Sequence, residues 1–156
     1  MIETPGKLYG GVQDLRIRYK VDLCWHSLGK PLEERFPGLF WTRGAVVHEA
    51  QVALASNPVT RNKVAKGISQ HELGEALDAD AKRALMVKAY VWAHAHLPWW
   101  QLIIYFRSPE PLDGIGESFH ISMLSEFSQI KRKALYQVNN TWHNFDGTFQ
   151  NLPLHA

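Results

Sequence analysis

Two short stretches of the sequence carry the residue types that bind metal ions. The first reads SQHELGEALD and places His71 seven residues before Asp78, with Gly74 between them. Neutral imidazole nitrogens and carboxylate oxygens are both good zinc donors. Because glycine permits a sharp turn, we expect a loop histidine and a strand aspartate to converge on one ion. An alternative stays open, since Ser69 and Glu72 also have the spacing of a helix capping box.

The second stretch, GIGESFHIS, contains Glu117 three residues before His120. On a strand these two side chains point to opposite faces, whereas a bend at the end of the preceding loop would bring both to one ion. Combined with the first stretch, His120 completes a site of two histidines and one aspartate, with an open coordination position and the Glu117 carboxylate beside it. This is the composition of a catalytic zinc site rather than a structural one.

These residues resemble the signature of a known family. The pattern S-x-H-x-x-G-x-A-x-D, matched by residues 69–78 at every specified position, is similar to that of the zinc D-Ala-D-Ala carboxypeptidases and L-alanyl-D-glutamate endopeptidases of bacteria and phages. That family is related to lysostaphin and the hedgehog domain. The family has an arginine at the end of a strand, which Arg43 matches, and then a helix, which HEAQ at 48–51 matches. Its glutamate three residues before the last zinc histidine is matched by Glu117. The likeness covers residues 39–123.

The resemblance implies one zinc ion per chain, held by His71, Asp78 and His120. It implies that Glu117 takes a proton from the attacking water and passes it to the leaving amine. Arg43 would bind a substrate carboxylate or the developing oxyanion, and Arg61 is a rival for the carboxylate-binding role. Ser69 would support the metal-binding loop or border the substrate.

The same resemblance implies a hydrolase that cuts peptidoglycan stem peptides. Residues 1–6 lack the basic and then apolar stretches of a signal peptide, and the chain has no wall-binding module. We therefore expect a phage endolysin or a virion-associated peptidase, made in the cytoplasm and acting on the cell wall, with virion proteins as further partners. The alternative is a virion structural or assembly protein that retains the peptidase fold. The choice between L-Ala-D-Glu endopeptidase and D-Ala-D-Ala carboxypeptidase stays open, since both use these residues.

Nucleic acid and membrane are not expected partners. Residues 67–83 also fit a helix-turn-helix, but its second helix would begin near Asp78 and is too acidic for a phosphate-lined groove. The net charge of +2 comes without dense basic clusters. No apolar run reaches the roughly 18 residues that a membrane-spanning helix needs.

The elements that must position this site fit into one domain of 156 residues, 46% of them apolar. We expect an α+β fold with a small, mainly antiparallel sheet and flanking helices. The single cysteine, Cys24, is expected to be a buried apolar residue. His94 and His96, two residues apart on a predicted helix, are expected to have surface or capping roles.

Apolar spacing predicts the elements of the chain. Residues 13–30 fit a helix, although alternation from Leu15 to Trp25 also fits a strand, and we expect a break at Lys30–Pro31. The other predicted helices cover 45–55 and 80–96. Strands are predicted at 39–41, 101–106 and 119–124, and loops at 58–69 and 108–116. Residues 131–156 have no clear period and receive no prediction.

Overall fold

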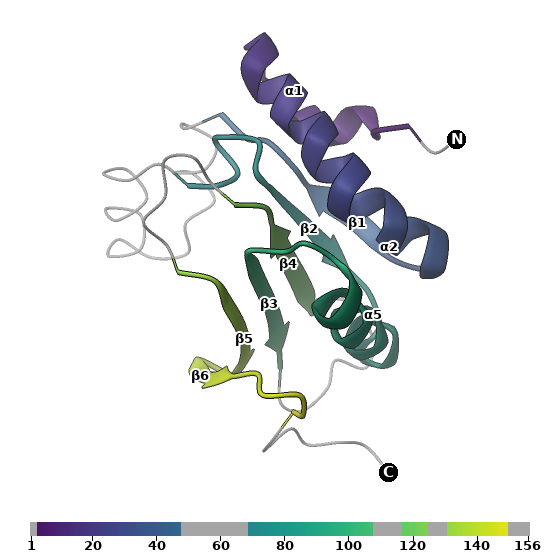
Figure 1. Cartoon of the computed structure of the whole chain (residues 1–156), viewed down its shortest axis with the longest axis vertical. Helices are drawn as coiled ribbons and strands as arrows, with labels where there is room; N and C mark the ends of the chain where they lie inside the picture. The colour runs from purple at the N-terminus through teal and green to yellow at the C-terminus, as the bar shows by residue number, and fades with distance from the viewer. Residues whose placement is uncertain (1–2, 48–68, 108–116, 125–130, 150–156) are drawn as a thin grey trace.

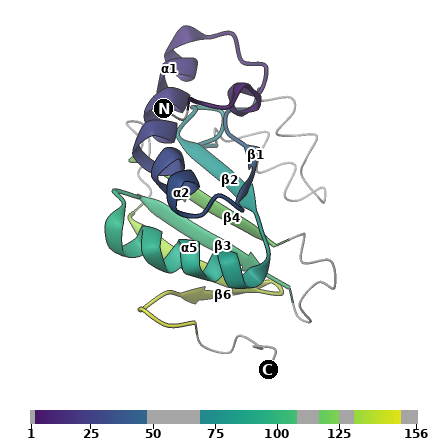
Figure 2. The same ribbon diagram turned by 90° about the vertical axis from the view of Figure 1, so that its right-hand side faces the viewer.

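The structure is a computed structural model, and it describes residues 3–47, 69–107, 117–124 and 131–149. Its centre is a six-stranded sheet in the order β1-β2-β4-β3-β5-β6, with helices packed on one face (Figures 1 and 2). Among the strand pairs of the described residues, only β3–β5 is parallel. The expected α+β fold with a mainly antiparallel sheet is therefore confirmed.

The strands have clear bounds: β1 Phe40–Arg43, β2 Ala76–Asp80, β3 Gln101–Phe106, β4 Ser118–Ser122, β5 Lys133–Val138 and β6 Thr141–Asn144. Alternate side chains of the central strands face the helices and are fully buried, among them Leu77, Leu102 and Phe119. The residues between them therefore face the opposite side of the sheet.

The first helical segment confirms the helical interpretation of residues 13–30. It runs as α1 (Leu15–Cys24), a π-helical turn η2 (Trp25–Gly29) and α2 (Lys30–Arg35). The expected break at Pro31 is wrong, because the helical segment continues through the π-helical turn into α2 with the proline in its first turn. The side chain of Asp14 caps α1 by accepting a bond from the Arg16 N–H.

The helix α5 (Arg83–His96) confirms the prediction over 80–96 and ends before Pro98. Its last-turn histidines are structural: His94 stacks on Trp99, and His96 stacks on Trp92. Every helix among the described residues is too short or too polar to span a bilayer. Cys24 is buried as expected, and burial raises the pKa of its thiol.

The strands β5 and β6 lie in the segment without a prediction. They form a hairpin whose two turn residues, Asn139 and Asn140, both have positive φ, as a type I′ turn requires. An Asn-Asn pair between strand-prone residues is a hairpin signal, so this element was predictable in principle.

Several predictions fall outside the described residues. These are most of the helix over 45–55, the loops 58–68 and 108–116, and the residue Arg61. The described part of the first of these, residues 45–47, is not helical.

Candidate metal centre

Asp78 and His120 meet because their strands are neighbours. They are direct cross-strand partners in the β2–β4 ladder, so their side chains lie on the same face of the sheet. Leu77 and Ala79 on either side of Asp78 are fully buried against the helices, which turns the aspartate to the opposite face. On that face Asp78 Oδ1 lies 2.8 Å from His120 Nδ1.

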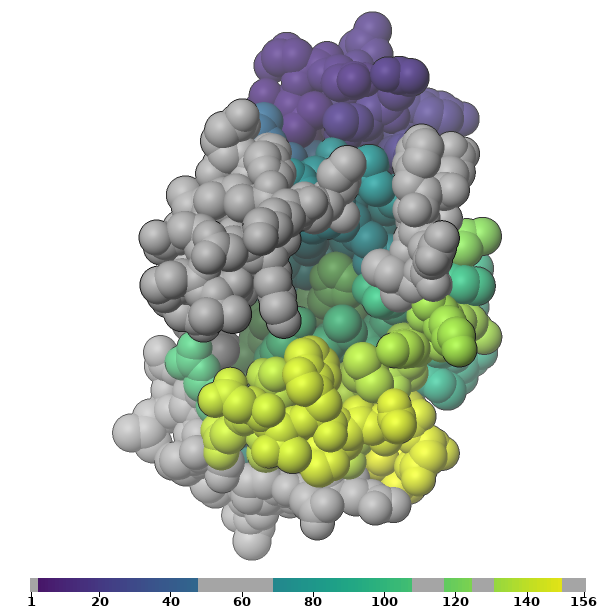
Figure 3. All heavy atoms as spheres, turned by 90° about the vertical axis from the view of Figure 1, so that its left-hand side faces the viewer, coloured from purple at the N-terminus to yellow at the C-terminus, as the bar shows by residue number. Residues whose placement is uncertain are grey.

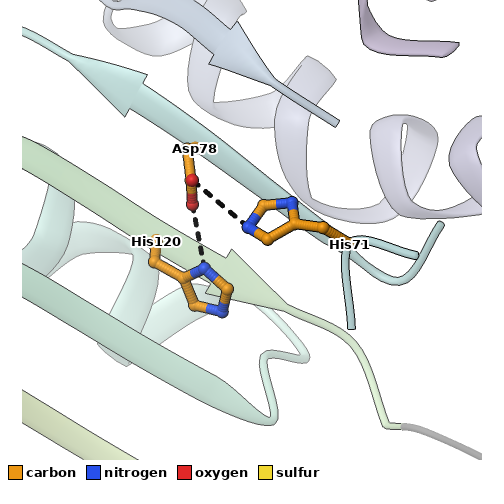
Figure 4. A group of neighbouring side chains, drawn as sticks. All are labelled: His71, Asp78 and His120. Carbon is orange, nitrogen blue, oxygen red and sulfur yellow. Dashed lines mark hydrogen bonds and ion pairs between the residues drawn. The ribbon is translucent and has the colours of Figure 1, made fainter. Parts of the chain in front are cut away.

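His71 reaches the same place from a turn that precedes β2. The turn ends at Gly74, which has a φ of +72°, a conformation that glycine adopts without a steric penalty. The chain then enters β2 two residues before Asp78, and His71 Nε2 lies 3.2 Å from Asp78 Oδ2 (Figure 4). The predicted convergence of a loop histidine with a strand aspartate is therefore present.

The ring of His71 is held in one orientation. Its Nδ1 lies 2.7 Å from the carbonyl oxygen of Gly44 and donates to it, and its own carbonyl accepts from the Val46 N–H at 3.2 Å. Gly44 itself is packed tightly, since a Cβ there would lie 2.3 Å from the Leu8 carbonyl oxygen. Packing of this segment against the N-terminal 3-10 helix η1 (Gly6–Tyr9) thus fixes the tautomer of a candidate ligand.

The charges of the three side chains fit a cation. With Nδ1 of His71 bound to a carbonyl, Nε2 would turn a lone pair toward the Asp78 carboxylate unless a proton or a metal ion stands between them. Burial by itself raises the pKa of Asp78, but the charges and hydrogen bonds of His71 and His120 outweigh it and hold that pKa well below its usual range. A divalent ion held by the three side chains would supply positive charge beside the Asp78 carboxylate.

The distances also fit a small ion. One donor atom from each of His71, Asp78 and His120 lies within 4.8 Å of the other two. Each histidine also lies near one oxygen of Asp78, His71 Nε2 at 3.2 Å from Oδ2 and His120 Nδ1 at 2.8 Å from Oδ1. Neighbouring ligands in a tetrahedral zinc site with bonds near 2.0 Å are roughly 3.3 Å apart. His120 Nε2 is buried and has no partner among the described residues. Its ring is therefore less firmly oriented than that of His71.

The structure brings Arg43 to the centre as well. Arg43 pairs with Asp78 across a β-bulge in the β1–β2 ladder, and its Nη1 lies 4.0 Å from Asp78 Oδ2. Its side chain is 31% exposed, so the guanidinium has donors to spare for a ligand. Asp80 follows on the same face, where burial and the charge of Asp78 raise its pKa and Arg43 opposes that shift.

Ser69 caps the turn that carries His71. Its backbone N–H donates to the Glu72 carboxylate at 2.6 Å, and its Oγ accepts from the Glu72 N–H at 3.3 Å. The reciprocal bonds of a capping box are thus made, although they close a turn rather than a helix. The capping interpretation and the metal interpretation are both compatible with this geometry. No described contact gives Ser69 a place on the substrate side.

Glu117 is not brought to the centre, which corrects its expected place beside the ligands. It directly precedes β4, lies on the helix side of the sheet, opposite His120, and is only 1% exposed. Arg83 Nε donates to both of its carboxylate oxygens at 3.1 Å, Arg83 Nη2 donates to Oε1, and the Arg107 N–H donates to Oε1 at 3.0 Å. No bend intervenes between Glu117 and His120, so the strand period of two keeps them apart.

Two further residues were missed by the sequence reasoning. The Gly44 carbonyl orients His71, and Arg83 neutralises Glu117. Gly44 follows the matched Arg43 directly and could have been considered with it. No sequence pattern points to Arg83, because its partner Glu117 is 34 positions away.

Comparison with known proteins adds no relatives. No protein-family model, no curated protein and no solved structure matches this chain.

Proposed function

We propose that this protein is a zinc-dependent peptidase that hydrolyses peptide bonds in peptidoglycan stem peptides, in phage lysis or as part of a virion. The convergence of His71, Asp78 and His120 from two sequence-distant stretches carries the proposal. The signature S-x-H-x-x-G-x-A-x-D and the presence of Arg43 beside Asp78 add to it. The three candidate ligands and Arg43 are the residues to which the family resemblance assigns metal binding and carboxylate binding.

In this proposal the zinc ion would be held by the two histidines and Asp78, where it would polarise the scissile carbonyl and activate water for attack. Arg43 binds the carboxylate of the stem peptide or stabilises negative charge on the carbonyl oxygen. The Gly44 carbonyl keeps the His71 ring in its ligating orientation. Glu117 receives no part in proton transfer, since Arg83 holds its carboxylate on the other face.

One observation favours a second candidate. Among the described residues, the glutamate expected to act as the base is bound to Arg83 instead. A virion structural or assembly protein that keeps the metal centre for stability needs no base. The two candidates differ in whether the zinc-loaded protein cleaves peptidoglycan.

The test is a digest of purified peptidoglycan from Gram-negative and Gram-positive cells, read by mass spectrometry of the released fragments. The protein is used after metal removal by a chelator, after zinc addition and after magnesium addition. We expect cleavage only with zinc, and the fragment masses identify the bond. The His71→Ala variant should be inactive, whereas His26→Ala, which changes an exposed histidine of η2, should be active. Folded, zinc-loaded protein without cleavage would favour the structural candidate.

A further inference from the structure

The metal centre lies in one row of cross-strand partners, and a second row runs directly beside it. The first row contains Asp78, His120 and Ile103 on β2, β4 and β3. The second row continues across the sheet to the terminal hairpin and consists of Asp80, Ser118, Tyr105, Gln137 and Trp142. Since direct partners share a face, all of these side chains lie on the side of the metal centre. Tyr105 is the diagonal neighbour of His120.

This face of the sheet is open to ligands where the structure describes it. Figure 3 looks onto the side away from the helices, where teal and green strand atoms lie at the floor of a hollow bordered by the yellow atoms of the β5–β6 hairpin. The hairpin contributes Trp142, which is 48% exposed. The ring of Tyr105 packs edge-to-face against Trp142, with ring centroids 5.6 Å apart. That contact orients the phenol on the face of the sheet that carries the metal centre.

Two other tyrosines use their hydroxyls within the protein. Tyr90 donates to the Leu135 carbonyl at 3.1 Å, and Tyr9 donates to Asp22 at 2.5 Å. No described residue is hydrogen-bonded to the Tyr105 hydroxyl, although its ring is partly buried. A hydroxyl on the same face of the sheet as the metal centre, with no partner among the described residues, has a donor that a ligand can use.

The electrostatic environment agrees with this placement. Burial and then the negative charge of Asp78 raise the pKa of Tyr105, so the phenol lies within electrostatic reach of the candidate ligand. A raised pKa keeps the hydroxyl protonated around neutral pH, which makes it a donor. The acceptor class that suits this donor is therefore an oxygen that becomes negative next to the metal centre.

We infer that Tyr105 is a substrate-contacting residue, whose hydroxyl donates a hydrogen bond to the scissile carbonyl oxygen as that carbon becomes tetrahedral. This inference rests on the proposed peptidase function and adds a residue that the sequence motifs do not contain. The phenol keeps its proton throughout. Water forms a C–O bond to the carbonyl carbon and the C–N bond breaks, so that the carbon keeps the hydroxyl of the water and the leaving nitrogen gains its proton. Trp142 keeps the Tyr105 ring in place and forms one wall for the stem peptide.

The test compares Tyr105→Phe with Tyr19→Phe, which removes the hydroxyl of an exposed tyrosine on α1. The probe is a purified disaccharide-pentapeptide, and zinc affinity and thermal unfolding are measured alongside. Loss of one oxyanion donor lowers kcat by about 100-fold or more. We expect this loss in Tyr105→Phe with little change in KM, zinc affinity or thermal midpoint, and no loss in Tyr19→Phe.

A second measurement does not depend on turnover. A phosphinic dipeptide, which imitates the tetrahedral carbon, should bind Tyr105→Phe more weakly than wild type, whereas the product peptide should bind both equally. Equal kcat and equal phosphinate affinity in an active protein would overturn the role of Tyr105 and leave the proposed function intact. A wild-type protein that binds zinc but cleaves no stem peptide would overturn both.

Discussion

Replacing Glu117 by glutamine separates the role predicted from the sequence from the role that the structure gives it. The carboxylate is 1% exposed, and Arg83 is 4% exposed. Glutamine keeps an oxygen for the Arg107 N–H but leaves the Arg83 guanidinium buried without its counter-charge. Breaking such a pair costs about 3–5 kcal/mol, and each 1.4 kcal/mol is tenfold. The folding equilibrium should therefore fall by roughly two to almost four powers of ten.

Urea unfolding followed by tryptophan fluorescence measures this loss, with chelator present so that metal binding does not contribute. The control is Glu34→Gln, which makes the same chemical change at an exposed position of α2 and should change stability by less than about 0.5 kcal/mol. A double variant with Arg83→Met and Glu117→Gln removes both charges. It should lose less stability than the two single variants added together, because the pair is coupled.

The opposite pattern would refute the reasoning. If Glu117→Gln unfolds at the same urea concentration as wild type but no longer cleaves peptidoglycan, the carboxylate acts in catalysis rather than in the ion pair. The structural role requires reduced stability in the single variant and partial recovery in the double variant. Zinc affinity does not distinguish the catalytic role from the ion-pair role, so stability and cleavage are the quantities compared.

Three further predictions concern the metal, the turn and pH. Zinc at 100 times its dissociation constant should raise the free energy of unfolding by about 2.7 kcal/mol, and His71→Ala should remove that increment in the same urea assay. Gly74→Ala should destabilise by more than about 1 kcal/mol, because φ is +72° and the new Cβ would meet the Ile17 carbonyl oxygen at 2.6 Å; an unchanged thermal midpoint would contradict this. Burial and then the charge of Arg132 lower the pKa of His94 from its ordinary 6.5. Below about pH 6.5 the unfolded chain binds a proton at His94 more readily than the folded chain, so the free energy of unfolding should fall as the pH drops. His94→Gln should flatten that part of the pH profile, and NMR titration of the imidazole ring checks the pKa directly.

The sequence by itself determined the chemistry of the candidate centre. The residue types of the metal triad and the spacing around Gly74 were enough to predict that a loop histidine and a strand aspartate meet. That part succeeded because it depends on local geometry, namely a turn of a few residues followed by a strand. The helical interpretation of residues 13–30 and the bounds of β3 succeeded for the same reason, since apolar periodicity reports which face is buried.

Only the tertiary structure decided which groups share a face. Glu117 and His120 are three residues apart, and whether a strand or a bend joins them depends on pairing with β2 and β3. The partner of Glu117 comes from the start of α5, and Tyr105 of the neighbouring strand β3 is the diagonal neighbour of His120. Such contacts follow from strand order and register, which long-range burial fixes and which local residue preferences do not encode.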